Sequence, residues 1–411
     1  MRLGRRTFAA CWVVNPDKKV LICGGGVAGP ACAYWLNKYG YTVVVAEKAP
    51  GLRDGGQNVD IKGAGQRVIE KMGLVDAVIA KDTQEQGQKY LDAAGHVVAT
   101  LPKQAFGSLT NDFEILRGDF ARILYDLTQD QCEYRFDTVV AYLEEKSHCV
   151  SVTFGDRTVE DFEFVVCAEG MGSSTRQMVM AQEVRFRYLG AHMSFFNIPR
   201  RPEDDHWALT VNGLGGTFLT LRPGNDTETT VLLTFLAHED GTPGDAAAPK
   251  DLLRRALDGR GTIADRVSSE LDAVEDFYFG PMSQVHVSRW SKGRVVLVGD
   301  AAYCPTPFTG SGTALALVGA YVLAGELSRH RDHAEAFVAY ERLVRPYAEA
   351  AQNQLTPALI RFIHVKTRLE VALAHLLIRG IALGATQRIA KLIADRRGTE
   401  VADEFVLADY F

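Results

Sequence analysis

The sequence predicts an α/β fold with a parallel sheet, because three glycine-containing turns each follow a short apolar run typical of a buried strand. These turns lie at residues 24–29, 169–176 and 299–312. Ligands of open α/β sheets bind where parallel strands end, so the three turns predict one shared binding crevice. Residues 183–285 differ, because their Phe- and Thr-rich strands predict an inserted antiparallel sheet with one covered face.

The first turn carries the most specific motif of the chain. An apolar run at 20–23 leads into Gly24 and the pattern G-x-G-x-x-G, a helix follows as far as Tyr39, and a second run at 42–46 ends before Glu47. In such a unit the first glycine allows the tight turn, the second lets backbone approach a pyrophosphate, and the third lets the helix pack on the strand. The helix N-terminus adds free N–H groups and a positive dipole end. The residues predicted to bind a dinucleotide here are Gly24, Gly26, Val27, Ala28 and Gly29.

Glu47 closes the second strand of this unit. A carboxylate there can accept hydrogen bonds from both hydroxyls of an adenosine ribose, whereas a 2′-phosphate would meet a like charge. The tightly held nucleotide is therefore expected to be FAD or NAD rather than NADP.

Composition limits the class of protein. The chain has 411 residues, of which 47% are apolar and 23% charged, as expected for a soluble globular protein of two or three domains. A net charge of −6 argues against a nucleic-acid partner, since no basic excess exists to neutralise phosphates. The seven cysteines include no C-x-x-C pair and predict buried thiols in a reducing, cytoplasmic compartment.

The first sixteen residues contain three arginines and then a short apolar run. A secretory or transit segment is one interpretation, but the apolar run is short for it, and a dispensable extension or a packed strand is favoured. No stretch of the chain reaches the length of a membrane span.

Further elements are predicted from local patterns. Helices are expected at 65–72 and from residue 116 onward, and residues 87–101 read as a hairpin turning at Ala94-Gly95. Arg117, just before the second helix, reads by itself as an ordinary surface cation. A glycine-rich loop from 48 to 60 is expected to lie over a ligand or over solvent.

The third turn follows the buried strand predicted for residues 290–300 and precedes a long helix, 314–329. Asp300 at this strand end is either a helix cap or a partner for a ribityl or ribose hydroxyl. Beyond residue 334 the pattern is helical, with an apolar stripe expected to pack on the main body or a second subunit rather than on a membrane surface. The stripe comprises Leu369, Leu373, Leu376 and Leu377.

In this order, the three motifs resemble those of the single-component FAD-dependent aromatic hydroxylases of the p-hydroxybenzoate hydroxylase fold, over residues 19 to about 330. Residues 55–63 are most similar to the subgroup that contains the tetracycline-inactivating monooxygenases. The resemblance implies a Rossmann-like FAD-binding domain of the GR2 type, an inserted β-sheet substrate domain and C-terminal helices. The implied division is 17–182 and 286–333 for the FAD-binding domain, 183–285 for the substrate domain and 334–411 for the C-terminal helices.

The same resemblance implies the cofactor contacts. Glu47 and Lys48 would address the adenosine half of FAD. Asp60 and Arg117 would lie on the flavin side, with Asp300 at the ribityl-phosphate region. The resemblance also places Pro307, Gly310 and Gly312 at the isoalloxazine edge and Arg53 at the nicotinamide cofactor.

Five positions depart from the family pattern. Glu169 stands where Asp is usual, which puts its cofactor contact in doubt, and Tyr303, Ser311 and Ala314 replace the usual His, Gln and Asn. Lys48 replaces the commoner Arg and lacks the planar group that stacks on adenine.

A single dinucleotide motif implies that only one of the two cofactors is bound permanently. With FAD held tightly, NADPH or NADH must bind transiently and leave. Reduced flavin and O2 would form a C4a-hydroperoxyflavin, and the protein would exclude water and place an electron-rich carbon near it. Backbone N–H groups at 310–312 would stabilise charge at the flavin pyrimidine edge, and no side-chain nucleophile is required.

The substrate is expected to be an aromatic, phenolic or polyketide-like small molecule bound against the inserted sheet. Candidate wall residues are Phe195, Phe196, Trp207, Phe218 and Phe235, although most strand aromatics belong to a core. Histidines at 192, 206, 238 and 286 are expected to be structural or exposed rather than catalytic. The oligomeric state is expected to be monomer or homodimer.

Three other functions are compatible with an FAD-binding scaffold of this kind. A halogenase of this scaffold would carry a Trp-x-Trp motif, which the chain lacks. An FAD-dependent oxidase or dehydrogenase of a natural product is a nearer alternative. A non-catalytic protein that binds flavin and a natural product is the third.

Overall fold

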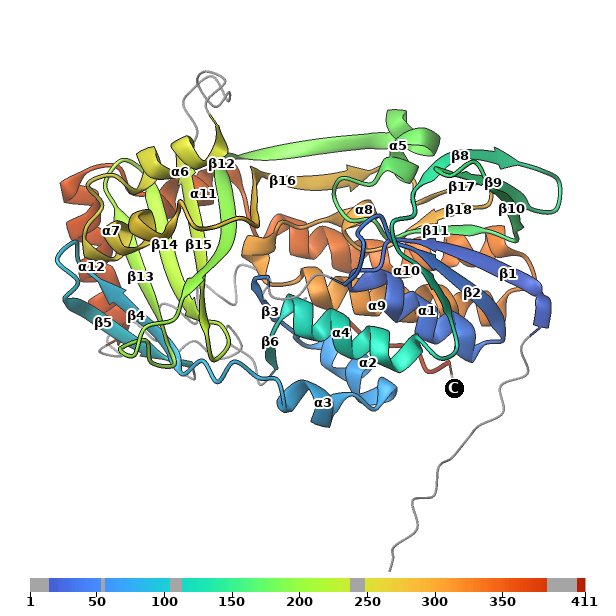
Figure 1. Cartoon of the computed structure of the whole chain (residues 1–411), viewed down its shortest axis with the longest axis horizontal. Coiled ribbons are helices and arrows are strands. Elements are labelled where there is room, and N and C mark those ends of the chain that lie inside the picture. Colours follow the sequence, from blue (N-terminus) through green and yellow to red (C-terminus); the bar gives the residue numbers. More distant parts are fainter. Residues whose placement is uncertain (1–14, 53–55, 104–112, 237–247, 383–404, 411) are drawn as a thin grey trace, which may run out of the picture.

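The computed structural model describes residues 15–52, 56–103, 113–236, 248–382 and 405–410. These residues form two lobes joined by two long antiparallel strands, β12 (Val184–Pro199) and β16 (Phe277–Val287), which run from one lobe into the other (Figure 1). Arg53, His238 and the first fourteen residues lie outside the described residues.

The first lobe contains the predicted parallel sheet. Its strand order is β17-β18-β11-β1-β2-β7, and every pair is parallel except the edge pair β17 and β18. The strands are β1 (Asn15–Cys23), β2 (Tyr41–Ala46), β7 (Glu133–Arg135), β11 (Val165–Cys167), β17 (Ser291–Lys292) and β18 (Val295–Leu297). Since β1, β11 and β18 are neighbours, the three turns that follow them meet at one edge of the sheet.

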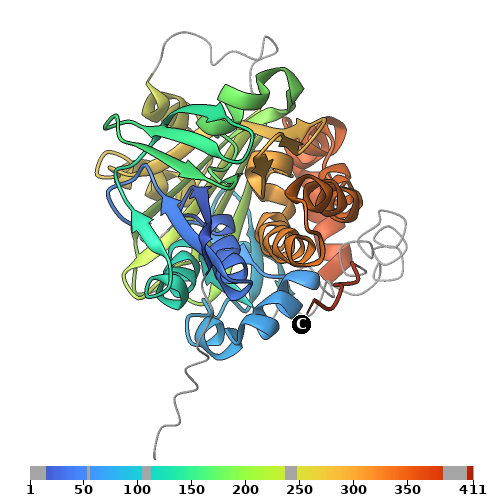
Figure 2. The ribbon, with the colours of Figure 1, turned by 90° about the vertical axis from the view of Figure 1, so that its right-hand side faces the viewer.

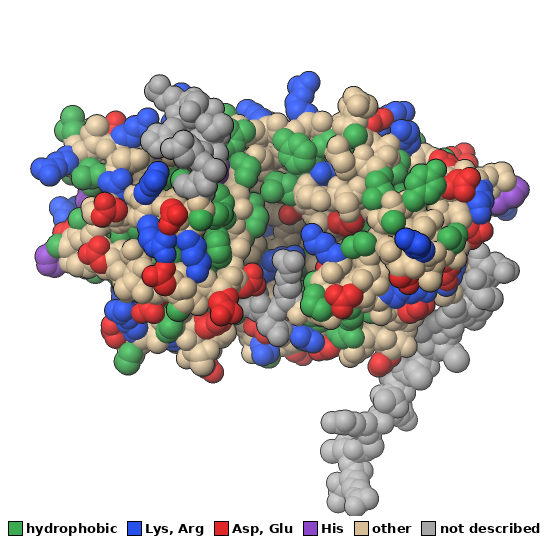
Figure 3. All heavy atoms as spheres, turned by 45° about the horizontal axis from the view of Figure 1, so that its top comes forward, with side chains coloured by type: hydrophobic (Ala, Val, Ile, Leu, Met, Phe, Trp, Pro, Cys, Tyr) green, Lys and Arg blue, Asp and Glu red, His purple; other side chains and the backbone are tan. Residues whose placement is uncertain are grey.

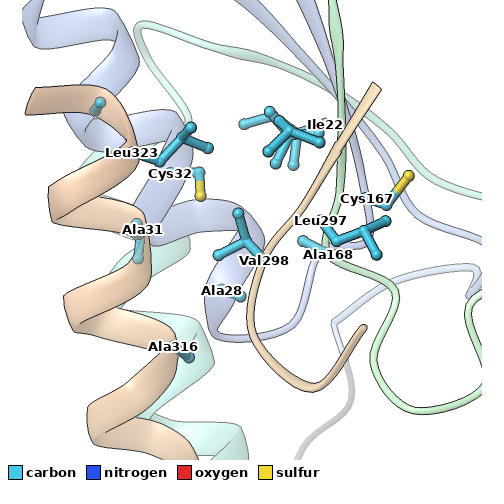
Figure 4. Close-up of a cluster of buried hydrophobic side chains, with 14 of the residues drawn as sticks. Ile22, Ala28, Ala31, Cys32, Cys167, Ala168, Leu297, Val298, Ala316 and Leu323 are labelled. Atoms are coloured by element: carbon cyan, nitrogen blue, oxygen red, sulfur yellow. The ribbon is translucent and has the colours of Figure 1, made fainter. Parts of the chain in front are cut away.

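Helices α1 (Ala28–Lys38), α9 (Gly312–Arg329) and α10 (His333–Asn353) pack with this sheet. Figure 4 shows side chains of β1, α1 and α9, among them Ile22, Cys32 and Leu323, closing the core between sheet and helices. Nearly all of α9 is buried because α1 and α10 cover it, which explains its apolar sequence without a membrane. None of the described helices is long and apolar enough to cross a membrane.

A three-stranded meander lies on the other side of the lobe from the C-terminal helices (Figure 2). It consists of β8 (Val140–Glu145), β9 (Val150–Phe154) and β10 (Val159–Phe162). Smaller elements of the lobe are β3 (Asn58–Asp60), α2 (Ala64–Met72), α3 (Val75–Ile79), β6 (Glu114–Leu116), α4 (Arg117–Thr128), α5 (Ser174–Met180) and α8 (Asp300–Tyr303).

The second lobe is a seven-stranded sheet of order β16-β12-β15-β14-β13-β4-β5. Its remaining strands are β4 (Gly87–Leu91), β5 (Val97–Pro102), β13 (Trp207–Gly213), β14 (Thr217–Pro223) and β15 (Glu228–Leu236). The hairpin predicted at 87–101 is confirmed as β4 and β5. The strands within 183–285 pair antiparallel with one another, as expected from the sequence. The sheet extends beyond them, because β4 comes from outside the insert and pairs with β13 in parallel.

One face of this sheet is covered by α6 (Pro249–Leu257) and α7 (Thr262–Glu270). Side chains that alternate along the strands, such as Phe196, Leu219 and Leu233, pack under these helices. The opposite face, which carries Met193, Phe195 and Leu232, packs in part against residues 355–360.

Two helices complete the described chain, α11 (Pro357–Ile363) and α12 (Arg368–Ala382). The apolar stripe of α12 does not pack on the main body among the described residues, so that part of the expectation is wrong, while packing on a second subunit stays a prediction. Its four leucines, at 369, 373, 376 and 377, are each about half exposed or more in the described structure. The helix instead meets β5 through another side, where Arg379 donates to the carbonyl of Val98.

Candidate active site

A cavity of about 740 Å³ lies between the two lobes. Residues of all three predicted turns line it at one end, and residues of β4, β12, β13, β14 and β15 line it at the other. Figure 3 shows the surface hollowed between the lobes. The cavity is thus continuous from the glycine motif to the large sheet.

The glycine motif packs as tightly as its pattern requires. Gly24 has a φ of +106°, and a Cβ there would lie 2.5 Å from the carbonyl oxygen of Ala168. A Cβ on Gly29 would lie 1.9 Å from the carbonyl oxygen of Gly24. Any larger residue would push the helix off the strand or separate the first turn from the second.

Helix α1 begins at this turn without a side-chain cap, since its N-cap residue is Val27. Its first N–H groups therefore remain for a ligand, at the positive end of the helix dipole. Gly24, Gly26, Val27 and Ala28 all line the cavity, whereas Gly29 lies behind them and serves packing alone.

Glu47 lines the cavity and already holds two backbone donors. One carboxylate oxygen accepts from the N–H of Gly25 at 2.6 Å, and the other accepts from that of Ala49 at 2.9 Å. These bonds fix the carboxylate across the turn while each oxygen keeps a further lone pair for a hydroxyl. Lys48 beside it is exposed and also lines the cavity.

The extra methylene of Glu169 has a structural use. Its carboxylate accepts from Ser173 Oγ at 2.5 Å, from Ser174 Oγ at 3.0 Å and from the N–H of Thr175 at 3.0 Å. The side chain thus turns back onto the start of α5. Although Glu169 lines the cavity, its carboxylate is committed to ordering the second turn.

Arg176 connects the second turn to the third. Its guanidinium is buried and donates to the carbonyl of Met171 at 2.7 Å and to that of Ala301 at 2.9 Å. The sequence offered one signal, an arginine inside an otherwise small-residue turn, but its role could not be read without the pairing of the strands.

Arg117 is half-buried at the cavity and is no ordinary surface cation. A Cβ on Gly26 would lie 3.1 Å from Arg117 Nη2, so the guanidinium reaches the glycine motif. Burial raises the pKa of Asp300, and the positive charge of Arg117 partly offsets that rise. The guanidinium of Arg117, at the start of α4, therefore lies close enough to act on both the glycine motif and Asp300 of the third turn.

The third turn places its predicted residues along the cavity. Pro307, Gly310 and Gly312 all line it, and α9 begins at Gly312 without a side-chain cap from Ser311. Gly310 has a φ of +64°, and a Cβ there would lie 3.1 Å from Asp60 Oδ2. A second uncapped helix N-terminus thus faces the cavity beside Asp60.

Two departures from the family pattern face the core instead. Tyr303 is buried, with its hydroxyl 3.1 Å from that of Tyr340, and a Cβ on Gly319 would lie 2.0 Å from the Tyr303 oxygen. Ala314 is buried against Gly65, where a Cβ would lie 2.9 Å from the Ala314 Cβ. Neither residue lines the cavity, so their exchange leaves its surface unchanged.

The large sheet contributes two of the five aromatic candidates. Phe195 and Phe218 line the cavity, and the Phe218 ring lies between Phe308 and His364, with centroids 5.8 and 6.2 Å away. Phe196 points to the opposite face, and Trp207 and Phe235 do not line the cavity.

No described histidine lines the cavity. His192 packs against Phe235 and Phe279, at centroid distances of 5.9 and 5.7 Å, and burial lowers its pKa. His286 contacts Gln284 Oε1 at 3.2 Å.

Several lining residues were missed by sequence reasoning. Gln88 and Tyr90 come from β4, and Glu85 and Arg222 meet at the cavity border. The alternation of Gln88 and Tyr90 along one strand was a signal, but only the unforeseen pairing of β4 with β13 turns that face toward the cavity.

Comparison with known proteins agrees with this geometry. A family model described as an FAD binding domain matches residues 17–354. The chain belongs to this FAD-binding family. A flavin-dependent monooxygenase of an unknown prokaryotic organism is 37% identical over 341 residues, covering 82% of this chain and 88% of that protein. The FAD-dependent monooxygenase asL4 of Sarocladium schorii is 34% identical over 372 residues, covering 83% and 86%.

Among solved structures, the tetracycline destructase Tet(55) is 31% identical, with a TM-score of 0.78 over 96% of this chain and 100% of that one. The expected p-hydroxybenzoate hydroxylase-type fold and the resemblance to the tetracycline destructase type are confirmed. The protein is an FAD-dependent monooxygenase, an oxidoreductase of the flavoprotein class.

The residues present fit FAD. The cavity offers two uncapped helix N-termini, at α1 and α9, for a pyrophosphate and for an electron-rich ring edge. Gly26 and Gly310 line the cavity without a Cβ, so a cofactor can lie against their backbone at both ends. The missing caps and the missing Cβ atoms together form a cradle along one wall.

Proposed function

We propose that the protein uses NAD(P)H and O2 to hydroxylate an aromatic, phenolic or polyketide-like small molecule. The observation that carries the proposal is the continuity of the cavity, from the glycine motif to the aromatic face of the large sheet. An extended FAD bound along the glycine-motif end of the cavity would leave its reactive ring facing Phe195 and Phe218. When bound, FAD supplies the redox chemistry, taking electrons from NAD(P)H and activating O2.

In this proposal the residues of the first lobe hold the cofactor. Glu47 receives the adenosine ribose, and the open N–H groups at the start of α1 receive the pyrophosphate, with Arg117 beside them. Asp300 receives a ribityl hydroxyl. Its raised pKa indicates that the buried carboxylate lacks solvation, which a donor hydroxyl would supply.

The residues of the third turn would contact the isoalloxazine ring, the reacting end of FAD. The sequence expectation for the N–H groups at 310–312 is narrowed, because Gly310 already donates to the carbonyl of Pro307 at 3.0 Å and Ser311 to Thr309 Oγ1 at 3.2 Å. The N–H of Gly312, at the start of α9, and the helix dipole would stabilise negative charge at the pyrimidine edge. The substrate is then held against Phe218, whose orientation is set by Phe308 and His364. Arg53 as a nicotinamide contact stays a prediction, as does the domain division.

The proposal is tested with FAD-loaded protein by following NADPH and NADH oxidation in the presence of phenolic compounds, with mass analysis of products. Accelerated oxidation with a product heavier by one oxygen atom supports it. Oxidised product without inserted oxygen would favour an oxidase or dehydrogenase, and a ligand that binds without turnover would favour a binding protein.

A matched pair of variants locates the substrate. Phe218→Ala removes a ring that lines the cavity and should raise KM about ten-fold or more, whereas Phe235→Ala removes a ring off the cavity and should leave KM unchanged. Equal effects of the two variants on KM would place the substrate elsewhere.

A further inference from the structure

We propose that the substrate is bound as an uncharged molecule, and that paired carboxylates around Arg222 exclude anionic aromatic acids from the cavity. The inference rests on the proposed function, because it concerns the substrate of that same site. It follows from the side chains at the sheet end of the cavity, defined here as the part lined by Gln88, Tyr90, Phe195, Phe218, Thr220 and Leu232.

Arg222 is the cation that a carboxylate substrate would need, and it is already paired twice. Its Nε donates to Glu85 Oε2 at 2.9 Å, and its Nη2 lies 2.9 Å from Glu114 Oε2. The exposed fraction of the side chain is 5% for Glu85 and 0% for Glu114. Buried pairs of this kind do not exchange partners without leaving an uncompensated carboxylate.

Glu114 is held in place from its other side. Its Oε1 accepts from Asn58 Nδ2 at 2.8 Å and from Thr83 Oγ1 at 2.7 Å, while Asn58 also donates to the carbonyl of Pro223. These bonds tie Glu114 of β6 to the strand end that carries Arg222. The arginine is thus fixed toward the carboxylates.

The local charge is not positive in either protonation state of Glu85. Burial raises the pKa of Glu85, and the charges of Glu114 and Asp60 add to that rise against the opposing effect of Arg222. With Glu85 ionised, Arg222 faces two carboxylates, and with Glu85 protonated it still faces Glu114. Asp60 is the other carboxylate near Arg222, and it is itself paired with Lys62 Nζ at 3.6 Å. An anion would therefore meet repulsion when Glu85 is ionised, and when Glu85 is protonated it would find the charge of Arg222 already balanced by Glu114.

The remaining polar groups suit hydroxyls and carbonyls. Tyr90 donates to Gln88 Oε1 at 3.1 Å, Gln88 donates to Thr210 Oγ1 at 2.5 Å, and Thr210 and Thr220 share a hydrogen bond of 3.0 Å. Burial raises the pKa of Tyr90 to about 12, so its phenol stays neutral at physiological pH. A strip of neutral donors and acceptors beside apolar rings fits a flat, polyhydroxylated, uncharged aromatic or polyketide.

The test compares three dihydroxyanthraquinones that differ at one ring carbon: chrysophanol with a methyl group, aloe-emodin with a hydroxymethyl group and rhein with a carboxylate. Binding to the FAD-loaded protein at pH 8 is measured from the perturbation of the flavin absorbance, without NADPH. We expect chrysophanol and aloe-emodin to bind at least ten-fold more tightly than rhein. Rhein binding as tightly as the other two would overturn the proposal, and so would the failure of all three to bind.

Variants separate charge from shape. Glu85→Gln removes one carboxylate from Arg222 and should improve the affinity for rhein relative to chrysophanol about ten-fold, whereas Arg222→Gln should weaken it further. The control is Asp204→Asn, which removes the partner of the buried Arg266 on the same lobe but outside the cavity. This control should leave the ratio of the rhein and chrysophanol affinities unchanged. A change in that ratio as large as in Glu85→Gln would contradict the role given to Glu85 and Arg222.

The outcome is independent of turnover. Chrysophanol that binds but does not accelerate NADPH oxidation would count against the proposed function and leave this inference standing. Rhein that binds tightly and is hydroxylated would support the proposed function and contradict this inference.

Discussion

The guanidinium of Arg176 donates to the backbone carbonyl of Ala301 at 2.9 Å, across 125 residues of sequence. Since Ala301 follows Asp300 and Arg176 follows the Glu169 turn, one side chain sets the spacing between the second and third walls of the cofactor cavity. This link joins the two turns in addition to the direct pairing of β11 with β18, the strands that precede them.

Arg176→Lys is expected to weaken FAD binding about ten-fold or more and to lower the free energy of unfolding by about 2 kcal/mol, because an ammonium cannot serve both carbonyls in this geometry. The dissociation constant for FAD and chemical denaturation would be measured. Arg345→Lys is the control, since Arg345 also donates to two carbonyls, of Val287 and Ser288, away from the cavity. Comparable losses of FAD affinity in both variants would show that Arg176 acts on stability alone.

Glu169→Asp, although it restores the usual residue of the family, should destabilise this protein by about 1 kcal/mol. The shorter side chain cannot reach Ser173, Ser174 and Thr175 together, so donors at the start of α5 lose their carboxylate acceptor. Thermal unfolding of the FAD-free protein measures the effect. An Asp variant at least as stable as the parent would mean that the methylene has no structural use.

Gly319→Ala should destabilise the protein by about 2 kcal/mol, although alanine favours helices over glycine, because the new Cβ would lie 2.0 Å from the Tyr303 oxygen. Tyr303→Phe removes that oxygen and should recover most of the loss in the double variant. Additive effects of the two substitutions in denaturant unfolding would contradict the contact.

Asp300→Asn should raise the thermal stability of the FAD-free protein near neutral pH while weakening FAD binding. Burial raises the folded-state pKa of Asp300, so ionisation costs folding energy. The stability of the parent attributable to this group is full below the ordinary Asp pKa and is lost as pH rises through the raised folded value. Thermal unfolding across that window should show the two proteins converging at acid pH, and parallel curves would contradict it.

The sequence predicted the parts of the cavity that depend on local pattern. The strand at 20–23, the glycine turn and the helix as far as Tyr39 follow from residues within a few positions of one another, and so do the strand ends at Glu47 and Asp300. The structure begins the strand earlier, at Asn15. Long-range pairing could not be read in the same way. The parallel junction of β4 with β13 brings Gln88 and Tyr90 to the site, and no local pattern encodes it.

The local sequence also could not explain why residues differ from the family pattern at positions such as Tyr303. Tyr303 replaces a histidine without changing the cavity because Gly319, sixteen residues later, leaves room for its ring. The exposed leucines of α12 show another limit of sequence patterns. An apolar stripe predicts that a helix face is buried, but it does not identify the surface that buries it.

The most direct test of the account is titration of the purified chain with FAD, followed by the structure of the complex. We expect one FAD per chain, with its adenosine at Glu47, its pyrophosphate at the start of α1 and its isoalloxazine ring between Gly310 and Phe218. A chain that stays colourless in excess FAD, or a flavin ring lying away from the large sheet, would contradict it.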